Sequence, residues 1–313
     1  MAIESGGRQA AAVPLAGQSG GSWEKGLRRF YIYMLAPAMI VLTLVVVVPL
    51  AFLVATSLTP WDLTKPETLR FGGLENFVEL ANDGRFWHSI WIQAQLSVVT
   101  VALQLGLGLL VAFLLNQKLR LVELLRTVFV VPMVLPPVVV AIVWKVLYTP
   151  DISVINYFLG LVGLPRPGWI GDPNLALWSI AIADIWEWFP FSMLMLLAAL
   201  QMLPEEPMEA ALIDGASYLQ SLRYITLPLL KPAILLVVIF RIIESIKAFP
   251  LIFIMTMGGP GMATEPTNFY AYLQSFNYGY VGYGSAISTV MVVMVILITL
   301  AIMRVSGEGT EVE

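Results

Sequence analysis

The chain has 313 residues, of which 58% are hydrophobic and only 12% charged, with a formal net charge of −4. Its mean hydropathy is +0.83, a value that excludes an ordinary soluble domain and indicates a protein integral to a lipid bilayer. The sequence has no cysteine and one histidine, which excludes disulfides, thiolate catalysis and metal or catalytic sites that need a pair of histidines. We expect no nucleic-acid partner.

Six apolar segments are long enough to cross a membrane. They are expected at residues 30–58, 90–115, 127–147, 175–200, 232–255 and 284–303. Only helices and closed barrels satisfy the backbone in lipid, and these segments lack the alternation of barrel strands. The sequence therefore predicts an all-α integral membrane protein with six transmembrane helices in one domain, residues 30–304.

The prolines inside two of these segments predict bends. Pro132, Pro136 and Pro137 fall in the third span and Pro190 in the fourth. Proline removes a backbone donor and clashes with the preceding turn, which kinks a helix. At Pro190 we expect a kink beside a cavity, and in the third span a kink that serves packing.

The basic residues predict the orientation. With a cytoplasmic N-terminus, the inner segments hold ten basic residues, namely Arg8, Lys25, Arg28, Arg29, Lys118, Arg120, Arg126, Arg223, Lys231 and Arg304. The outer segments hold four, namely Lys65, Arg70, Arg85 and Arg166. This positive-inside bias places both termini in the cytoplasm. Residues 1–29 and 305–313 are predicted to be cytoplasmic tails, the first with no apolar core of signal-peptide length.

A polar segment at residues 204–228 separates the fourth and fifth spans. Glu205, Glu206 and Pro207 suit the first turn of a helix, and Gly215 suits its end. A second short helix is expected at 217–225, ended by the prolines that follow. A turn between two spans needs only a few residues, so this segment predicts either a coupling element or a helix that lies on the membrane surface.

The same segment carries a specific motif. It reads Glu209-Ala210-Ala211, then Asp214-Gly215-Ala216, then Ile225-Thr226-Leu227-Pro228. Further matching elements are Gly73-Leu74-Glu75-Asn76-Phe77, Arg126 with Val131-Pro132, and Gly258-Gly259-Pro260-Gly261 with Thr264-Glu265. From about residue 35 to 303 the chain resembles the maltose- and glycerol-phosphate-type carbohydrate permeases of ABC importers, with their type I fold. Two residues depart from that pattern. Pro250 stands where many members carry an acidic residue, and Trp188 stands where the maltose-type permease has glycine.

The resemblance implies a set of partners in a bacterial or archaeal cell (inner) membrane. The chain would form half of a translocation pathway with a second homologous permease subunit, and an extracytoplasmic solute-binding protein would deliver a sugar or sugar alcohol. Its motif helix would enter a groove on an ATPase subunit dimer, which would bind ATP and Mg²⁺. The coupling residues implied are Glu209, Ala210, Ala211, Asp214, Gly215, Leu227 and Pro228. The chain has no G-x-x-x-x-G-K-[ST] loop, so no cofactor and no ATPase activity are expected in it.

Polar residues at bilayer depth are the candidates for a substrate site. Asp184, Glu187, Trp188 and Phe191 share one helical face, and Arg241, Glu244, Ser245 and Ala248 share another. Charges this deep normally face a cavity or a partner, and hydroxyl-bearing cargo needs both polar groups and aromatic faces. The family resemblance implies that the substrate contacts are Trp188, Phe191, Arg241, Glu244, Ser245 and Ala248. Asp184 and Glu187 are added as candidates because they lie on the same helical face as Trp188 and Phe191.

Alternatives stay open at this point. Arg241 and Glu244 could pair with each other, with Asp184 or with a partner, and only hold helices together. The cargo could be an anionic polyol, phosphorylated or sulfonated, bound through Arg241. A stand-alone carrier with Asp184 and Glu187 as proton sites is a third reading, which the lack of an inverted repeat disfavours. The aromatic outer loops fit either a docking face or an interfacial belt.

Overall fold

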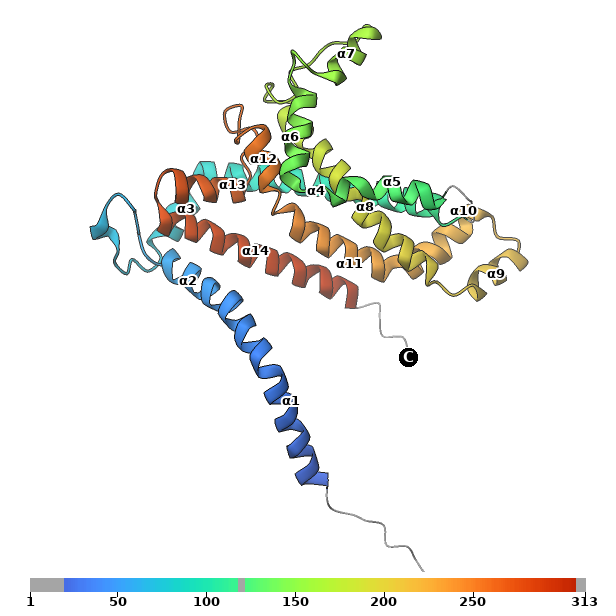
Figure 1. The fold of residues 1–313 in the computed structure, drawn as a ribbon, viewed down its shortest axis with the longest axis horizontal. Coiled ribbons are helices and arrows are strands. Elements are labelled where there is room, and N and C mark those ends of the chain that lie inside the picture. Colours follow the sequence, from blue (N-terminus) through green and yellow to red (C-terminus); the bar gives the residue numbers. More distant parts are fainter. Residues whose placement is uncertain (1–19, 118–121, 308–313) are drawn as a thin grey trace, which may run out of the picture. The chain divides into compact units, whose positions relative to one another are not determined.

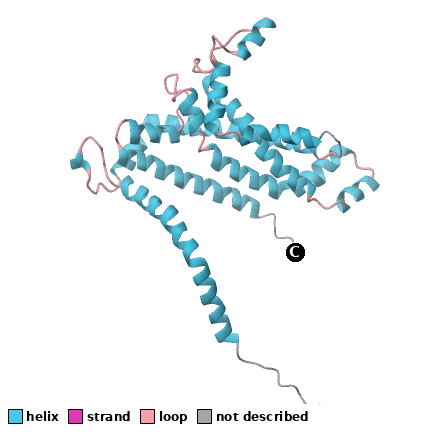
Figure 2. Ribbon diagram, viewed as in Figure 1, coloured by secondary structure: helices cyan, strands magenta, loops and turns pink. Residues whose placement is uncertain are grey.

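The computed structural model describes residues 20–117 and 122–307. Helices dominate these residues (Figure 2), and apart from one isolated bridge between Asp62 and Lys65 no strand pairing occurs among them. The all-α prediction is confirmed. The chain divides into two compact units, Met1–Phe52 and Leu53–Glu313. Of the predicted tails, residues 1–19 and 308–313 lie outside the described part.

The first unit is one long apolar helix. It comprises α1 (Gly20–Leu42), a π-helical turn (Thr43–Val47) and the start of α2 (Val48–Ser57). The candidate span covers Leu27–Ser57, slightly longer than the sequence predicts. Its large side chains, from Phe30 to Phe52, are exposed.

The second unit holds the remaining helices (Figure 1). The long ones are α4 (Gly84–Leu115), α8 (Ala176–Gln201), α11 (Leu227–Ser245) and α14 (Val281–Gly307). Shorter ones are α3 (Glu75–Asn82), α5 (Val122–Val134), α6 (Pro137–Tyr148), α7 (Val154–Leu161), α9 (Glu206–Ile213), α10 (Tyr218–Ser221), α12 (Phe249–Met255) and α13 (Thr267–Tyr272). Within this unit α3 and α13 lie at one end and α9 and α10 at the other (Figure 1). In the described residues five helices are long and apolar enough to span a membrane, or six if α5 and α6 form one bent span.

Helices α4 and α8 form the centre of this unit. Gly108 marks their closest approach, since a Cβ there would lie 2.6 Å from the Cβ of Ser192 and 2.8 Å from the backbone nitrogen of Met193. Small residues allow such close packing of helix backbones within a membrane. A buried apolar cluster that includes Ala112, Met193 and Leu196 continues this packing toward α9.

The third span bends sharply, as its prolines predict. The axes of α5 and α6 meet at 95°, and Pro136 precedes α6 in an extended conformation with Pro137 in the first turn. Because proline disfavours helical geometry in the residue before it, two consecutive prolines end one helix and begin the next. Helix α6 then packs against α12.

The fifth span is not the single helix expected at 232–255. Helix α11 ends at Ser245, Ala248 leaves the helical region with ψ 38°, and α12 begins at Phe249. In a continuous helix Pro250 would clash with the carbonyl of Ile246 and could not donate to it. That carbonyl instead accepts a hydrogen bond from Asn268 Nδ2 at 2.9 Å. The prediction overlooked Pro250 as a helix breaker.

Candidate functional site

Arg241 and Asp184 meet in the interior between α11 and α8. Both side chains are buried, and Arg241 Nη2 lies 3.8 Å from Asp184 Oδ2. Gln104 of α4 joins them: its Nε2 donates to Asp184 Oδ2 at 2.8 Å, and its Oε1 accepts from Arg241 Nε at 2.8 Å. Three helices thus contribute to one buried polar cluster, in which the two charges are compensated and hydrogen bonded.

Aromatic rings border this cluster. The Arg241 guanidinium lies 4.9 Å from the ring centroid of Trp188, a cation–π contact. The ring of Phe191, one turn along α8, lies edge-on to that of Phe240 at 6.3 Å. Trp188 and Phe191 are half-buried, so a polar, charge-compensated centre carries partly accessible aromatic faces.

Glu187 is the unusual member of the group. Its side chain is fully buried, and neither carboxylate oxygen has a hydrogen-bond partner among the described residues. A buried carboxylate without a partner is costly. Glu187 is therefore a group that a polar ligand or a further chain could satisfy.

The other predicted residues on α11 make separate contacts. Glu244 pairs with Lys247 at 2.9 Å and not with Arg241. Ser245 Oγ donates to Ser97 Oγ at 2.8 Å. Ala248 is half-buried at the break before α12. The structure thus brings Asp184, Trp188 and Arg241 together and places Glu244 and Ala248 apart from that contact.

Sequence reasoning missed the contribution of α4. Gln93, Ser97, Thr100 and Gln104 stand at steps of four, three and four, so they line one helical face. Gln93 Nε2 donates to Ser97 Oγ at 3.0 Å, and Gln104 reaches the charged pair. The stripe of uncharged polar residues on α4 could have indicated this contribution, but a search limited to charged residues does not detect it.

The polar segment 204–228 forms two short helices and a turn. Helix α9 begins at Glu206 with Pro207 in its first turn, and Gly215 follows its end with φ 77°. Ser217 then caps α10 in a reciprocal capping box with Gln220. The start and end of α9 are as predicted from the sequence.

The prediction that the second short helix ends before the fifth span is wrong. A π-helical turn (Leu222–Thr226) connects α10 directly to α11, and Leu227 N donates to Leu222 O. The wider turn accommodates Pro228, which lacks a backbone donor. The motif residues are divided: Ala211 is buried, Leu227 is half-buried, and Glu209, Ala210, Asp214, Gly215 and Pro228 are exposed.

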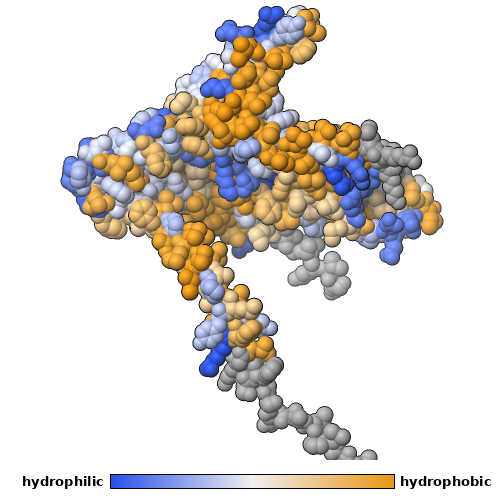
Figure 3. All heavy atoms as spheres, in the orientation of Figure 1, coloured by the Kyte–Doolittle hydropathy of each residue, from blue (hydrophilic) through white to orange (hydrophobic). Residues whose placement is uncertain are grey.

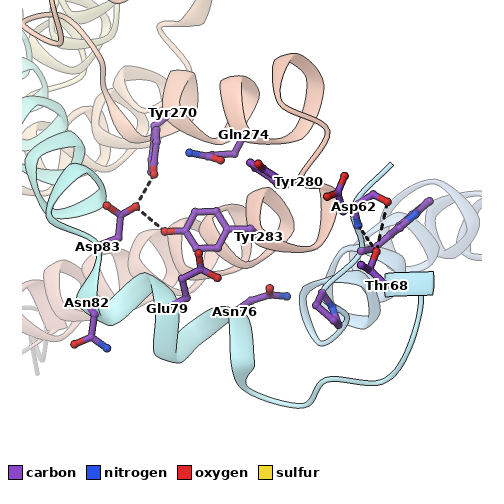
Figure 4. A pocket seen from close by; sticks show the side chains of 12 residues that line it. Asp62, Thr68, Asn76, Glu79, Asn82, Asp83, Tyr270, Gln274, Tyr280 and Tyr283 are labelled. Carbon is purple, nitrogen blue, oxygen red and sulfur yellow. Dashed lines mark hydrogen bonds between the residues drawn. The ribbon is translucent and has the colours of Figure 1, made fainter. Parts of the chain in front are cut away.

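At the opposite end of the unit a polar cavity of about 720 Å³ opens between α3, α13 and the start of α14 (Figure 4). Asp83 accepts hydrogen bonds there from the hydroxyls of Tyr270, at 2.5 Å, and Tyr283, at 2.6 Å. Burial alone would raise the pKa of Asp83, but these two hydrogen bonds and those from backbone amides hold the pKa below its usual value.

Arg85 forms a two-pronged ion pair with Glu265, with an Nη2–Oε2 distance of 2.7 Å. This ion pair and the hydrogen bond from Tyr270 to Asp83 tie α13 and the loop before it to the start of α4.

Comparisons with known proteins assign the chain to a family. Residues 104–307 match the family described as binding-protein-dependent transport system inner membrane component. The chain belongs to this family. The matched residues include Gln104, the cluster on α8 and α11, and the whole of segment 204–228, so this permease carries its candidate site within the family's shared region.

Some relatives of this permease are named for the transport of sugars or sugar derivatives. It is 36% identical over 78% of its length to the trehalose/maltose transport system permease protein MalF of Thermococcus litoralis, covering 82% of that protein. It is 34% identical over 90% of its length to the sulfoquinovosyl glycerol transport system permease protein SmoG of Agrobacterium fabrum, covering 91% of that protein. A solved bacterial ABC transporter involved in the import of the acidic polysaccharide alginate has a chain with the same fold, with a TM-score of 0.79 and 22% identity, covering 93% of this chain and 99% of that one.

Proposed function

We propose that this chain is the permease subunit of an ATP-driven, binding-protein-dependent importer for a neutral sugar or sugar alcohol. The observation that carries the proposal is the buried cluster of Arg241, Asp184 and Gln104 with Trp188 stacked on the guanidinium. Polar groups beside half-buried aromatic rings match the needs of a carbohydrate, which presents hydroxyls at its rim and C–H surfaces on its faces. Two relatives are named for the transport of trehalose or maltose, and SmoG is named for the transport of sulfoquinovosyl glycerol.

The charge balance of the cluster favours neutral cargo over anionic cargo. Arg241 is already compensated by Asp184, and Glu187 adds a second buried carboxylate. Among the described residues of the cluster no basic side chain is left over for a phosphate or a sulfonate. An anionic ligand would therefore have to displace Asp184, at a cost in free energy that a neutral ligand avoids.

Coupling to an ATPase is proposed through segment 204–228. Large apolar side chains on its surface are exposed, namely Leu212, Ile213, Tyr218, Leu219 and Tyr224. An exposed apolar helix face is typical of a segment that fits a groove on a partner. We infer that the partner is an ATPase dimer, which binds ATP and Mg²⁺, and that this chain is a transport subunit without its own ATPase site.

The remaining partners follow from the same assignment. A second homologous permease would complete the pathway, and a solute-binding protein would dock outside, as a periplasmic protein does in the complex solved for the alginate transporter. We place the assembly in the bacterial or archaeal cell (inner) membrane, with both termini of this chain in the cytoplasm.

The test is the ATPase activity of the reconstituted complex with its binding protein. Neutral sugars, polyols and their phosphorylated or sulfonated forms are compared at equal concentration. Stimulation by a neutral ligand supports the proposal, and stimulation by anions alone would assign Arg241 to an anionic cargo. Uptake that continues without ATP would contradict an ATP-driven importer.

A further inference from the structure

An apolar groove runs along α5 on the surface of the second unit. It has a volume of about 460 Å³ and is lined by Arg126, Thr127, Val130, Val131, Val134 and Leu135 of the α5 segment, with Leu194 of α8. Figure 3 shows a broad apolar surface over α5 and α6 on the face in view. Val131 and Val134 are more than half exposed, so the groove is open along its length.

Arg126 is the one lining group with unsatisfied polarity. Its Nε is buried and has no hydrogen-bond partner, and among the described side chains of residues 27–117 and 122–304 no carboxylate lies within ion-pair distance of its guanidinium. The hydroxyl of Thr127, the other polar lining residue, already donates to the backbone carbonyl of Glu123 at 3.0 Å. A ligand of this groove must therefore be apolar along its length and negatively charged at one end.

The length of the groove matches one leaflet of a bilayer. Arg126 and Val134 are eight residues apart on α5, a rise of about 12 Å at 1.5 Å per residue. Half of the hydrocarbon core is about 15 Å thick. The groove starts at the cytoplasmic end of α5, an orientation that rests on the proposed function, and it ends where the chain bends by 95° into α6.

We propose that this groove binds an anionic phospholipid of the cytoplasmic leaflet, with its phosphate on Arg126 and one acyl chain between α5 and Leu194. A charge-assisted hydrogen bond from the guanidinium to a phosphate oxygen would satisfy the orphaned Nε. An acyl chain would cover the valines. A purely apolar protein helix in the groove would leave Arg126 unpaired in a site of low dielectric constant, which is costly.

The experiment uses the absence of cysteine from this chain. Val131→Cys is labelled with bimane, the complex is assembled in nanodiscs, and quenching by brominated phosphatidylglycerol is compared with quenching by brominated phosphatidylcholine. We expect phosphatidylglycerol to be preferred by about fivefold in occupancy, the effect of one lipid–arginine charge contact. Arg126→Gln should abolish the preference and Arg126→Lys should largely retain it.

Two controls separate this site from general effects. Arg304→Gln removes an exposed charge at the end of α14 and should leave the preference unchanged. Inorganic phosphate at millimolar concentration should not displace the lipid if the acyl chain contributes to binding; displacement would show that a free anion is the ligand. Equal quenching by both lipids in the labelled Val131→Cys chain with Arg126 intact would overturn the proposal. No quenching by either lipid would also overturn it, by showing that protein covers the groove. Neither result bears on ATP-driven sugar import, which the ATPase assay tests separately.

Discussion

The guanidinium of Arg241 and the carboxylate of Asp184 lie 3.8 Å apart, on different helices and both out of contact with solvent. Gln104 makes the shorter contacts, at 2.8 Å to each. The pair is therefore held through an amide from a third helix. Such an arrangement fixes the register of α4, α8 and α11, and it also keeps Arg241 oriented over the ring of Trp188.

Removing one charge of this pair should destabilise the complex. Arg241→Met leaves Asp184 buried and uncompensated, at a cost of about 3–5 kcal/mol in unfolding free energy. The double variant Arg241→Met/Asp184→Leu should regain most of the loss, because neither member of the pair is then left buried without the other. Thermal melting of the purified complex measures both. A double variant as unstable as the single one would contradict the pairing.

Trp188 should govern transport affinity and leave stability nearly unchanged. Trp188→Ala removes the aromatic face beside Arg241, and we expect the half-saturating concentration for ATPase stimulation to rise about fivefold or more, the equivalent of about 1 kcal/mol. Trp178→Ala is the matched control, since Trp178 lies on the same helix with 39% of its surface exposed. Equal effects of the two substitutions would remove Trp188 from the substrate site.

The fold was predictable from the sequence because lipid permits few structures. Long apolar segments must be helices in a bilayer, and Pro136 and Pro137 mark the bend between α5 and α6. The break after Ser245 was signalled by Pro250, but apolar residues on both sides concealed it. The length of the apolar run alone cannot distinguish one span from a span followed by a separate helix.

The candidate site was only partly predictable for a different reason. Charges inside an apolar helix stand out in a sequence, so Asp184, Glu187 and Arg241 were found. Their partners depend on which helices are neighbours, and Gln104 belongs to a helix that has no charge after Arg85. The sequence left Arg241 open to pair with Glu244, with Asp184 or with a partner chain, and packing brings it to Gln104 of α4 and Asp184 of α8.

Gly215 should be required for coupling. Its φ of 77° is strained for any residue with a side chain, although nothing lies within 4 Å of an added Cβ, so Gly215→Ala costs about 1 kcal/mol through the backbone alone. We expect this strain to reorient α9 and to lower ligand-stimulated ATPase activity. Gly163→Ala is the matched control, because Gly163 has φ 73° and equally open surroundings in the loop after α7. Equal loss of activity in both variants would indicate a general folding defect.

The hydrogen bonds to Asp83 predict a pH dependence at the end of the second unit that holds α3 and α13. Its pKa is lower in the folded chain than in the unfolded chain, so its stabilising contribution is complete above the unfolded pKa of about 3.9 and is lost as pH falls through the folded pKa. The melting temperature of the complex should exceed that of Asp83→Asn by a constant margin from pH 7 to about pH 5, and the margin should shrink below about pH 4. Asp151→Asn, at an exposed carboxylate of the loop between α6 and α7, should show no such margin. A margin for Asp83→Asn that grows on acidification would mean that the tyrosine hydroxyls stabilise the protonated carboxyl instead.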